Sequence, residues 1–186
     1  MKRLVLVLFW PEAVWTLVRT RPRPVPTLML GIALPFAIVI AIAVQVGISV
    51  LNSDWSADWG YNPDPIFGRA TAAMAFVAAF AGPLLLAAMF ALLAPLCGGR
   101  RDFEASVNLA VHGAIPLWLA GCTLFLMPGL VLCMFAVAHS FFLFAQGARI
   151  LLGTDAEDSA QLVLGAVLCT WVIFLFMGIG VGSALV

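Results

Sequence analysis

The segment from Phe80 to Leu152 constrains the fold most, because it consists of three apolar stretches joined by two very short links. The first link is Gly-Gly-Arg-Arg-Asp at 98–102, and the second is Met-Pro-Gly at 127–129. A stretch of about 20 apolar residues crosses a hydrocarbon layer of about 30 Å as a helix. Consecutive helices this apolar cannot form the core of a soluble domain, so the segment predicts membrane-spanning helices.

The rest of the chain has the same character. Of its 186 residues, 64% are hydrophobic and 10% are charged, whereas soluble domains average about 25% charged residues. Five apolar spans take up nearly the whole chain: 27–51, 70–97, 105–127, 130–152 and 160–186. We therefore predict an all-α, polytopic transmembrane helix bundle, with an N-terminal segment at 1–26 and one five-helix domain at 27–186.

The N-terminal segment, residues 1–26, precedes the first predicted span. A cleaved signal peptide is not expected, because no small-residue cleavage site follows its first apolar run. Four apolar side chains recur on one helical face: Trp10, Val14, Leu17 and Val18. We predict a short amphipathic helix that lies on the bilayer surface, with a plain juxtamembrane linker as the alternative.

Basic residues are placed asymmetrically between the two predicted sides of the membrane. Eight of them fall on the side of the N-terminus: Lys2, Arg3, Arg19, Arg21, Arg23, Arg100, Arg101 and Arg149. The opposite side holds only Arg69. Since basic loops remain in the cytoplasm, we predict a cytoplasmic N-terminus, and an odd number of spans then places the C-terminus outside.

The pattern of reactive side chains predicts no enzyme. The cysteines lie in apolar segments without a paired C-x-x-C spacing, and two histidines are too few for a zinc site, which usually needs at least three protein ligands. The sequence contains no Ser/His/Asp set and no embedded pair of carboxylates. We therefore expect no catalytic residue, no metal site and no cofactor, and no nucleic-acid partner.

Polar residues within the predicted spans form a candidate intramembrane polar patch, because such residues are costly in a membrane and tend to be functional. Asn108 and His112 share a face of the third span, at i and i+4. His139 and Gln146 share a face of the fourth span, which the short turn makes an antiparallel neighbour. The patch could serve a lipid headgroup or a proton, or its hydrogen bonds could only fix helix packing.

Three arginines near the cytoplasmic surface are candidate lipid headgroup contacts: Arg100, Arg101 and Arg149. The guanidinium group presents a fork of donors that suits a phosphate, and basic clusters at this surface attract anionic lipids. Two alternatives remain for Arg149, namely an anchor for topology and ion pairing with the acidic link at 155–158.

Two pairs of small residues are candidate helix-contact sites, because small side chains spaced four apart let helix backbones approach closely in membranes. Ala78 and Gly82 form one pair in the second span. Gly178 and Gly182 form the other pair in the fifth span.

A scattered Gly, Pro and Trp pattern over residues 70–175 resembles a known family. It comprises Ala-Gly-Pro at 81–83, Leu-Ala-Pro-Leu-Cys-Gly-Gly at 93–99, Phe103, and Ile-Pro-Leu-Trp-Leu at 115–119. In these residues the chain is similar to the Yip family of Ypt/Rab-interacting membrane proteins. The resemblance implies five spans and a cytoplasmic N-terminus.

The eukaryotic members of the Yip family act in vesicle traffic and bind small GTPases through a long N-terminal region. With only residues 1–26 before the first span, we do not expect this chain to share the GTPase-binding role. It resembles the bacterial branch of the family.

These features together predict a non-enzymatic integral membrane protein of the bacterial inner membrane. It would organise membrane lipids or partner proteins, including other membrane proteins or a second copy of itself. The alternative is a small permease or lipid-moving protein with a path between spans two to four. A continuous polar cavity that reaches mid-membrane would favour transport, whereas a dry bundle would favour an organising role.

Overall fold

The computed structural model describes residues 7, 10–54, 65–123 and 129–184, and these described residues contain helices and no strand. The elements are, in chain order, α2 (Pro11–Thr20), α3 (Val25–Leu28), η1 (Met29–Ala33), α4 (Leu34–Asp54), α6 (Pro65–Leu93), η2 (Ala94–Cys97), α7 (Phe103–Gly113), α8 (Ile115–Gly121), α9 (Gly129–Gly147), η3 (Ala148–Leu152) and α10 (Ala156–Ala184). The chain is therefore all-α, as the sequence predicts.

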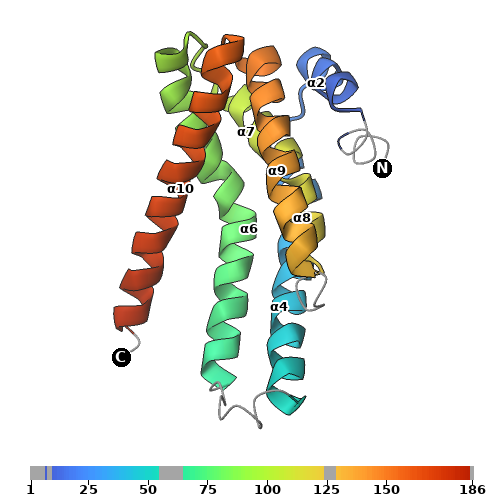
Figure 1. Cartoon of the computed structure of the whole chain (residues 1–186), viewed down its shortest axis with the longest axis vertical. Helices are drawn as coiled ribbons and strands as arrows, with labels where there is room; N and C mark the ends of the chain where they lie inside the picture. The colour runs from blue at the N-terminus through green and yellow to red at the C-terminus, as the bar shows by residue number, and fades with distance from the viewer. Residues whose placement is uncertain (1–6, 8–9, 55–64, 124–128, 185–186) are drawn as a thin grey trace.

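The helices form an elongated bundle with two unlike ends (Figure 1). One end, at the top of Figure 1, carries α2, the link 98–102 and the link 153–155, and we call it the charged end. At the opposite end α10 diverges from α4 and α6, and we call it the splayed end. The α6 and α10 helices run antiparallel, since α6 ends and α10 begins at the charged end.

Four helices of the described residues are long and apolar enough to cross a membrane. They are Val25–Ser49, Gly68–Cys97, Val131–Leu152 and Ala156–Met177. They correspond to the first, second, fourth and fifth predicted spans. The described residues thus contain four candidate membrane-spanning helices, within which two short π-helical segments, η1 and η3, interrupt the regular α-helix.

The third predicted span differs from the expectation of one continuous helix over 105–127. The structure divides it at Ala114 into α7 and α8, each too short to span a bilayer. Pro116 lies in the first turn of α8, and a proline in a helix interior removes a hydrogen bond and clashes with the preceding turn. A fifth crossing of the membrane therefore remains a prediction.

The amphipathic N-terminal helix is present as α2, but its apolar side packs against the protein. Val14, Trp15 and Val18 are buried, and α2 contacts α9 and η3. Trp10, which the sequence places on the apolar face, is 60% exposed. The buried face of α2 is therefore centred nearer Trp15 than the sequence predicts, because the Trp15 ring packs into the bundle beside Gly147.

The core is centred on α7, in which every residue from Ser106 to Gly113 is buried. Phe90 of α6 and Phe144 of α9 meet beside it, with ring centroids 5.6 Å apart. A β-carbon at Gly113 would collide with the Phe144 ring. The polar residues Ser106, Asn108 and His112 of α7 thus lie inside the bundle, where protein groups rather than lipid surround their side chains.

Candidate functional site

Asn108 joins α7 to the backbone that leads from α2 to the first span. Its Oδ1 accepts the backbone N–H of Arg23 at 3.2 Å, and its Nδ2 donates to the Arg23 carbonyl at 3.0 Å. Arg23 stands between Pro22 and Pro24, which have no backbone N–H. The Asn108 amide therefore pairs with the one backbone donor that this short segment has.

His112 lies one helical turn further along α7 and is fully buried. Its Nδ1 is 2.8 Å from the carbonyl oxygen of Asn108. The Trp15 ring of α2 meets its imidazole edge to face, with centroids 6.5 Å apart. Gly147 of α9 makes room for this arrangement, since a β-carbon there would lie 2.9 Å from the Trp15 ring and would collide with Leu109.

Arg100 fastens the link 98–102 to the end of the fourth span. Its backbone N–H donates to the Leu152 carbonyl at 2.8 Å, and its guanidinium donates twice to the Leu151 carbonyl, at 3.1 and 2.8 Å. The same guanidinium is 3.7 Å from the carboxylate of Asp102. Arg100 thus satisfies carbonyls that a helix C-terminus leaves without partners.

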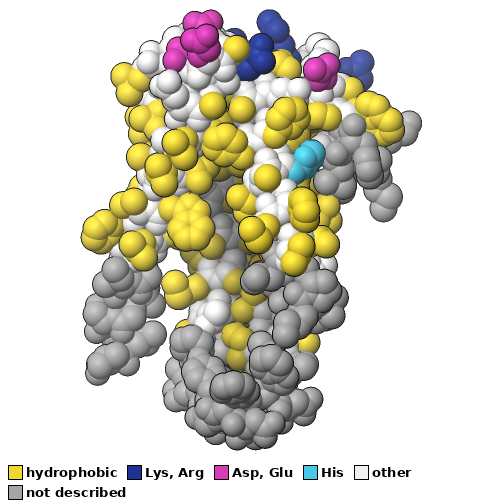
Figure 2. Space-filling model, in the orientation of Figure 1, with side chains coloured by type: hydrophobic (Ala, Val, Ile, Leu, Met, Phe, Trp, Pro, Cys, Tyr) yellow, Lys and Arg dark blue, Asp and Glu magenta, His cyan; other side chains and the backbone are white. Residues whose placement is uncertain are grey.

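The other two arginines of the predicted headgroup site are exposed. Arg101 lies in the link before α7, and Arg149 lies in η3. Figure 2 shows the Lys and Arg side chains of this face gathered at the charged end together with acidic side chains, above a mostly apolar surface. The contact of Arg100, Arg101 and Arg149 with a headgroup therefore stays a prediction, in which Arg100 already has protein partners.

The predicted polar patch divides into two parts. Asn108 and His112 are linked through the Asn108 carbonyl, and the Asn108 side chain bonds to Arg23 and to the Glu104 carbonyl. On α9, Nε2 of His139 and Oε1 of Gln146 are buried without a hydrogen-bond partner among the described residues. Sequence analysis did not include Arg23 and Trp15 in the patch, although Arg23 is hydrogen-bonded to Asn108 and Trp15 contacts His112.

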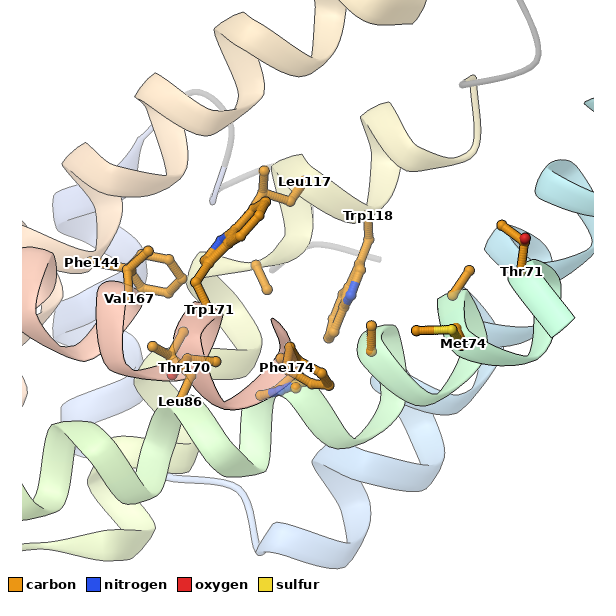
Figure 3. A pocket seen from close by; sticks show the side chains of 15 residues that line it. Thr71, Met74, Leu86, Leu117, Trp118, Phe144, Val167, Thr170, Trp171 and Phe174 are labelled. Atoms are coloured by element: carbon orange, nitrogen blue, oxygen red, sulfur yellow. The ribbon is translucent and has the colours of Figure 1, made fainter. Parts of the chain in front are cut away.

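A lateral cavity of about 710 Å³ lies between α6, α8, α9 and α10. In Figure 3 the rings of Trp118, Trp171 and Phe174 project into the space between the helices that carry them. Thr170 also lines the cavity, but its hydroxyl donates to the Ala166 carbonyl at 2.8 Å within α10. The lining is otherwise almost entirely apolar, so the cavity suits an apolar occupant.

The first predicted helix-contact pair borders this cavity. Ala78 and Gly82 both line it, and a β-carbon built at Gly82 would lie 3.7 Å from the Phe174 ring of α10. Gly178 and Gly182 belong to the last turns of α10, whose side-chain surroundings are outside the described residues. Closer helix contact at either pair stays a prediction.

A family model for the Yip1 domain matches residues 5–179 of the chain. Neither the comparison with curated proteins nor the comparison with solved structures gives a match. The matched range includes α2, the four long helices and the buried α7, so it covers both the charged end and the lateral cavity. Because this match extends over nearly the whole chain, the protein belongs to the Yip1 domain family, and its apolar helices make it an integral membrane protein.

Proposed function

We propose that this protein is a non-enzymatic member of the bacterial branch of the Yip family, which organises lipids or partner proteins in the inner membrane. The observation that carries the proposal is the lateral cavity, which is large but apolar. Three of the helices that line it, α6, α9 and α10, are long and apolar enough to cross a membrane, which supports lipid chains as its surroundings.

The apolar lining argues against a permease for polar solutes. A polar group that enters such a space loses its hydrogen bonds to water and costs several kcal/mol unless the protein replaces them. The polar side-chain groups of the described lining are the Thr71 and Thr170 hydroxyls and two indole N–H groups, and the Thr170 hydroxyl already donates to the Ala166 carbonyl. The more polar contacts, around Asn108 and Arg100, connect parts of the protein to each other.

A lipid-moving role is the alternative, and one observation favours it. The lining extends along α6 from Thr71 to Leu86, which at 1.5 Å per residue is about 22 Å. This length exceeds half of a hydrocarbon core of about 30 Å. A lipid that crosses the membrane must also carry its headgroup past the apolar lining, and for this reason we prefer the organising role.

A lipid-scrambling assay separates the two roles. Purified protein is reconstituted into vesicles that contain fluorescent phospholipid in both leaflets, and a membrane-impermeant reductant is added outside. An organising protein leaves the inner half of the fluorescence intact, as in protein-free vesicles. Loss of nearly all fluorescence would establish lipid movement and overturn the organising role.

Crosslinking in native membranes tests the organising role directly. A photoreactive amino acid at exposed positions of the charged end, such as Arg101 and Arg149, should capture a reproducible set of lipids or membrane proteins, identified by mass spectrometry. The same amino acid at exposed positions of α9, such as Phe135, serves as the control. If both positions capture the same bulk lipid mixture, the protein organises nothing at its charged end.

A further inference from the structure

The lateral cavity is built from unlike walls. On α6 its lining includes the small residues Ala75, Ala78 and Gly82, whereas α8 and α10 contribute the large rings of Trp118, Trp171 and Phe174 (Figure 3). Small residues on one helix and aromatic rings on its neighbours leave a groove along α6. Ala78 is exposed on the surface of the bundle, so the groove opens toward the membrane.

The α10 helix is the least buried of the four long apolar helices of the described residues. In its apolar 18-residue window 22% of the residues are buried, against 39% in the window of Val25–Ser49. Between α6 and α10, Gly82 lies beside Phe174, and Gly165 lies beside Leu93. A further element that fills the groove would add packing contacts to both helices, because atoms that line a void lack partners on one side.

Water is a poor occupant, since apolar cavities remain dry. A transmembrane helix, which is about 10–12 Å across with its side chains, would rest on the mouth of the groove. The cavity itself reaches inward to the almost fully buried rings of Trp118 and Phe144. A single polymethylene chain is narrow enough, and lipid tails are the material that surrounds the bundle.

We infer that the lateral cavity is a binding site for one acyl chain of a bilayer lipid, which packs between α6 and α10 and completes their interface. The inference rests on the proposed function and names the ligand of its cavity. The Ala78 and Gly82 side of the groove gives the chain its depth. The ring of Trp118, which is 5% exposed and stacks on Phe36 at 5.4 Å, forms its inner wall.

Trp118 makes the site measurable. Because its ring is almost fully buried, a quencher on a lipid chain inside the cavity comes closer to it than one on a chain outside the bundle. The full-length protein is reconstituted into phosphatidylcholine vesicles whose chains carry bromine atoms at mid-chain, and into unbrominated vesicles. The emission of Trp118 is the difference between wild-type protein and Trp118→Phe. We expect the brominated chains to abolish most of this emission.

Ala78→Phe fills the groove and should restore the Trp118 emission in brominated vesicles. Ala73→Phe is the matched control, since Ala73 is an exposed residue of the same helix outside the cavity lining. If Ala78→Phe does not fold, Gly82→Leu places a smaller group in the same groove. Equal Trp118 emission in brominated and unbrominated vesicles of the wild-type protein would overturn the inference.

A second copy of the chain is the competing occupant. Two results together would show that a second copy fills the groove: Ala78→Phe converts a dimer to a monomer in mass photometry, and brominated lipid does not change the Trp118 emission of the wild-type protein. The acyl-chain site would then be wrong. The scrambling assay does not depend on Trp118. If the protein scrambles lipids and brominated chains still quench Trp118, the acyl-chain site is supported and the organising role is wrong.

Discussion

The two ends of the bundle differ in what holds the helices together. At the charged end, hydrogen bonds join residues far apart in the chain, such as Asn108 with Arg23 and Arg100 with Leu151. Toward the splayed end, α10 exposes apolar side chains such as Trp171 and Phe176, and a large cavity separates it from α6 and α8.

This difference follows from the solvent. Lipid tails are as apolar as leucine, so an apolar helix gains little by leaving lipid for another apolar helix. Hydrogen bonds and close contacts at small residues supply specificity instead. The charged end has both, with the Asn108 amide and Gly147 as its main examples. The comparison teaches that hydrogen bonds and close contacts fix the helices at one end, while the other end leaves an apolar cavity between them.

The largest expected effect concerns which side of the membrane each end faces. A reporter fused to a fragment that ends at Asp155, in the link of the charged end, should be cytoplasmic, and a reporter fused after Val186 should lie outside. The physical reason is the excess of basic residues at the charged end. Alkaline phosphatase and green fluorescent protein fusions give opposite, all-or-none signals. A cytoplasmic signal after Val186 would contradict the odd number of crossings.

Replacing Gly147 with leucine should disrupt the packing of α2 against α9 at the charged end. The new side chain would collide with Leu109 and the Trp15 ring, so we expect a loss of about 1–3 kcal/mol in the free energy of unfolding, typical of overpacked cores. Thermal unfolding in detergent measures the loss, and hydrogen exchange over residues 11–20 should show that α2 is released.

Gly31→Leu is the control for this substitution, because a β-carbon at Gly31 meets no atom within 4 Å. It makes the same glycine-to-leucine substitution at another helical position of the bundle. If both variants lose equal stability, the effect comes from the backbone at glycine and not from the contact with Trp15.

Asn108→Ala should loosen the same end by a smaller amount. Hydrogen bonds between membrane helices average about 0.6 kcal/mol, and the substitution removes two to Arg23, so we expect a loss of about 1 kcal/mol. Hydrogen exchange at the Arg23 amide should then accelerate by up to about tenfold, since 1.4 kcal/mol corresponds to a factor of ten. Thr123→Val, which removes only a local bond to Ala120, should leave that exchange rate unchanged.

The smallest expected effect is on bound lipid at the charged end. Arg149→Gln should lower the amount of phosphatidylglycerol or cardiolipin that copurifies, because the exposed guanidinium can bind a phosphate. Fold and orientation should survive, since other basic residues remain at this end. Lipid mass spectrometry compares it with Arg69→Gln, which removes a basic residue near the start of α6. Unchanged anionic lipid in Arg149→Gln would exclude a headgroup contact at this residue.

The long helices could be predicted from the sequence because their signal is local. Each apolar run carries its own length and composition, and four of the five predicted runs appear as helices long and apolar enough to cross a membrane. The sequence predicts one continuous helix for the third run because its average is also apolar, although Pro116 and the polar residues Asn108 and His112 lie within it. Burial inside the protein, rather than exposure to lipid, makes those residues acceptable.

The candidate site could be predicted only in part, because its contacts join distant residues. Asn108 and Arg23 are 85 positions apart, and nothing near either residue indicates the other. Helical periodicity shows that α2 has an apolar side, but the direction of that side depends on Gly147, which makes room for Trp15. The lateral cavity depends on the divergence of α10 from α6, a tertiary property that no local pattern encodes.

The docking of α2 has a consequence for biosynthesis. The residues that receive Trp15, among them Leu109 and Gly147, are synthesised long after residue 20. At about 5–20 residues per second, the 127 residues between positions 20 and 147 take about 6–25 s to translate. During that time α2 lacks its contacts with α9 and η3, and the membrane surface is the place where an amphipathic helix rests. The nascent helix would therefore wait on the bilayer and move onto the bundle only when the fourth span arrives, which makes its docking a late event in assembly.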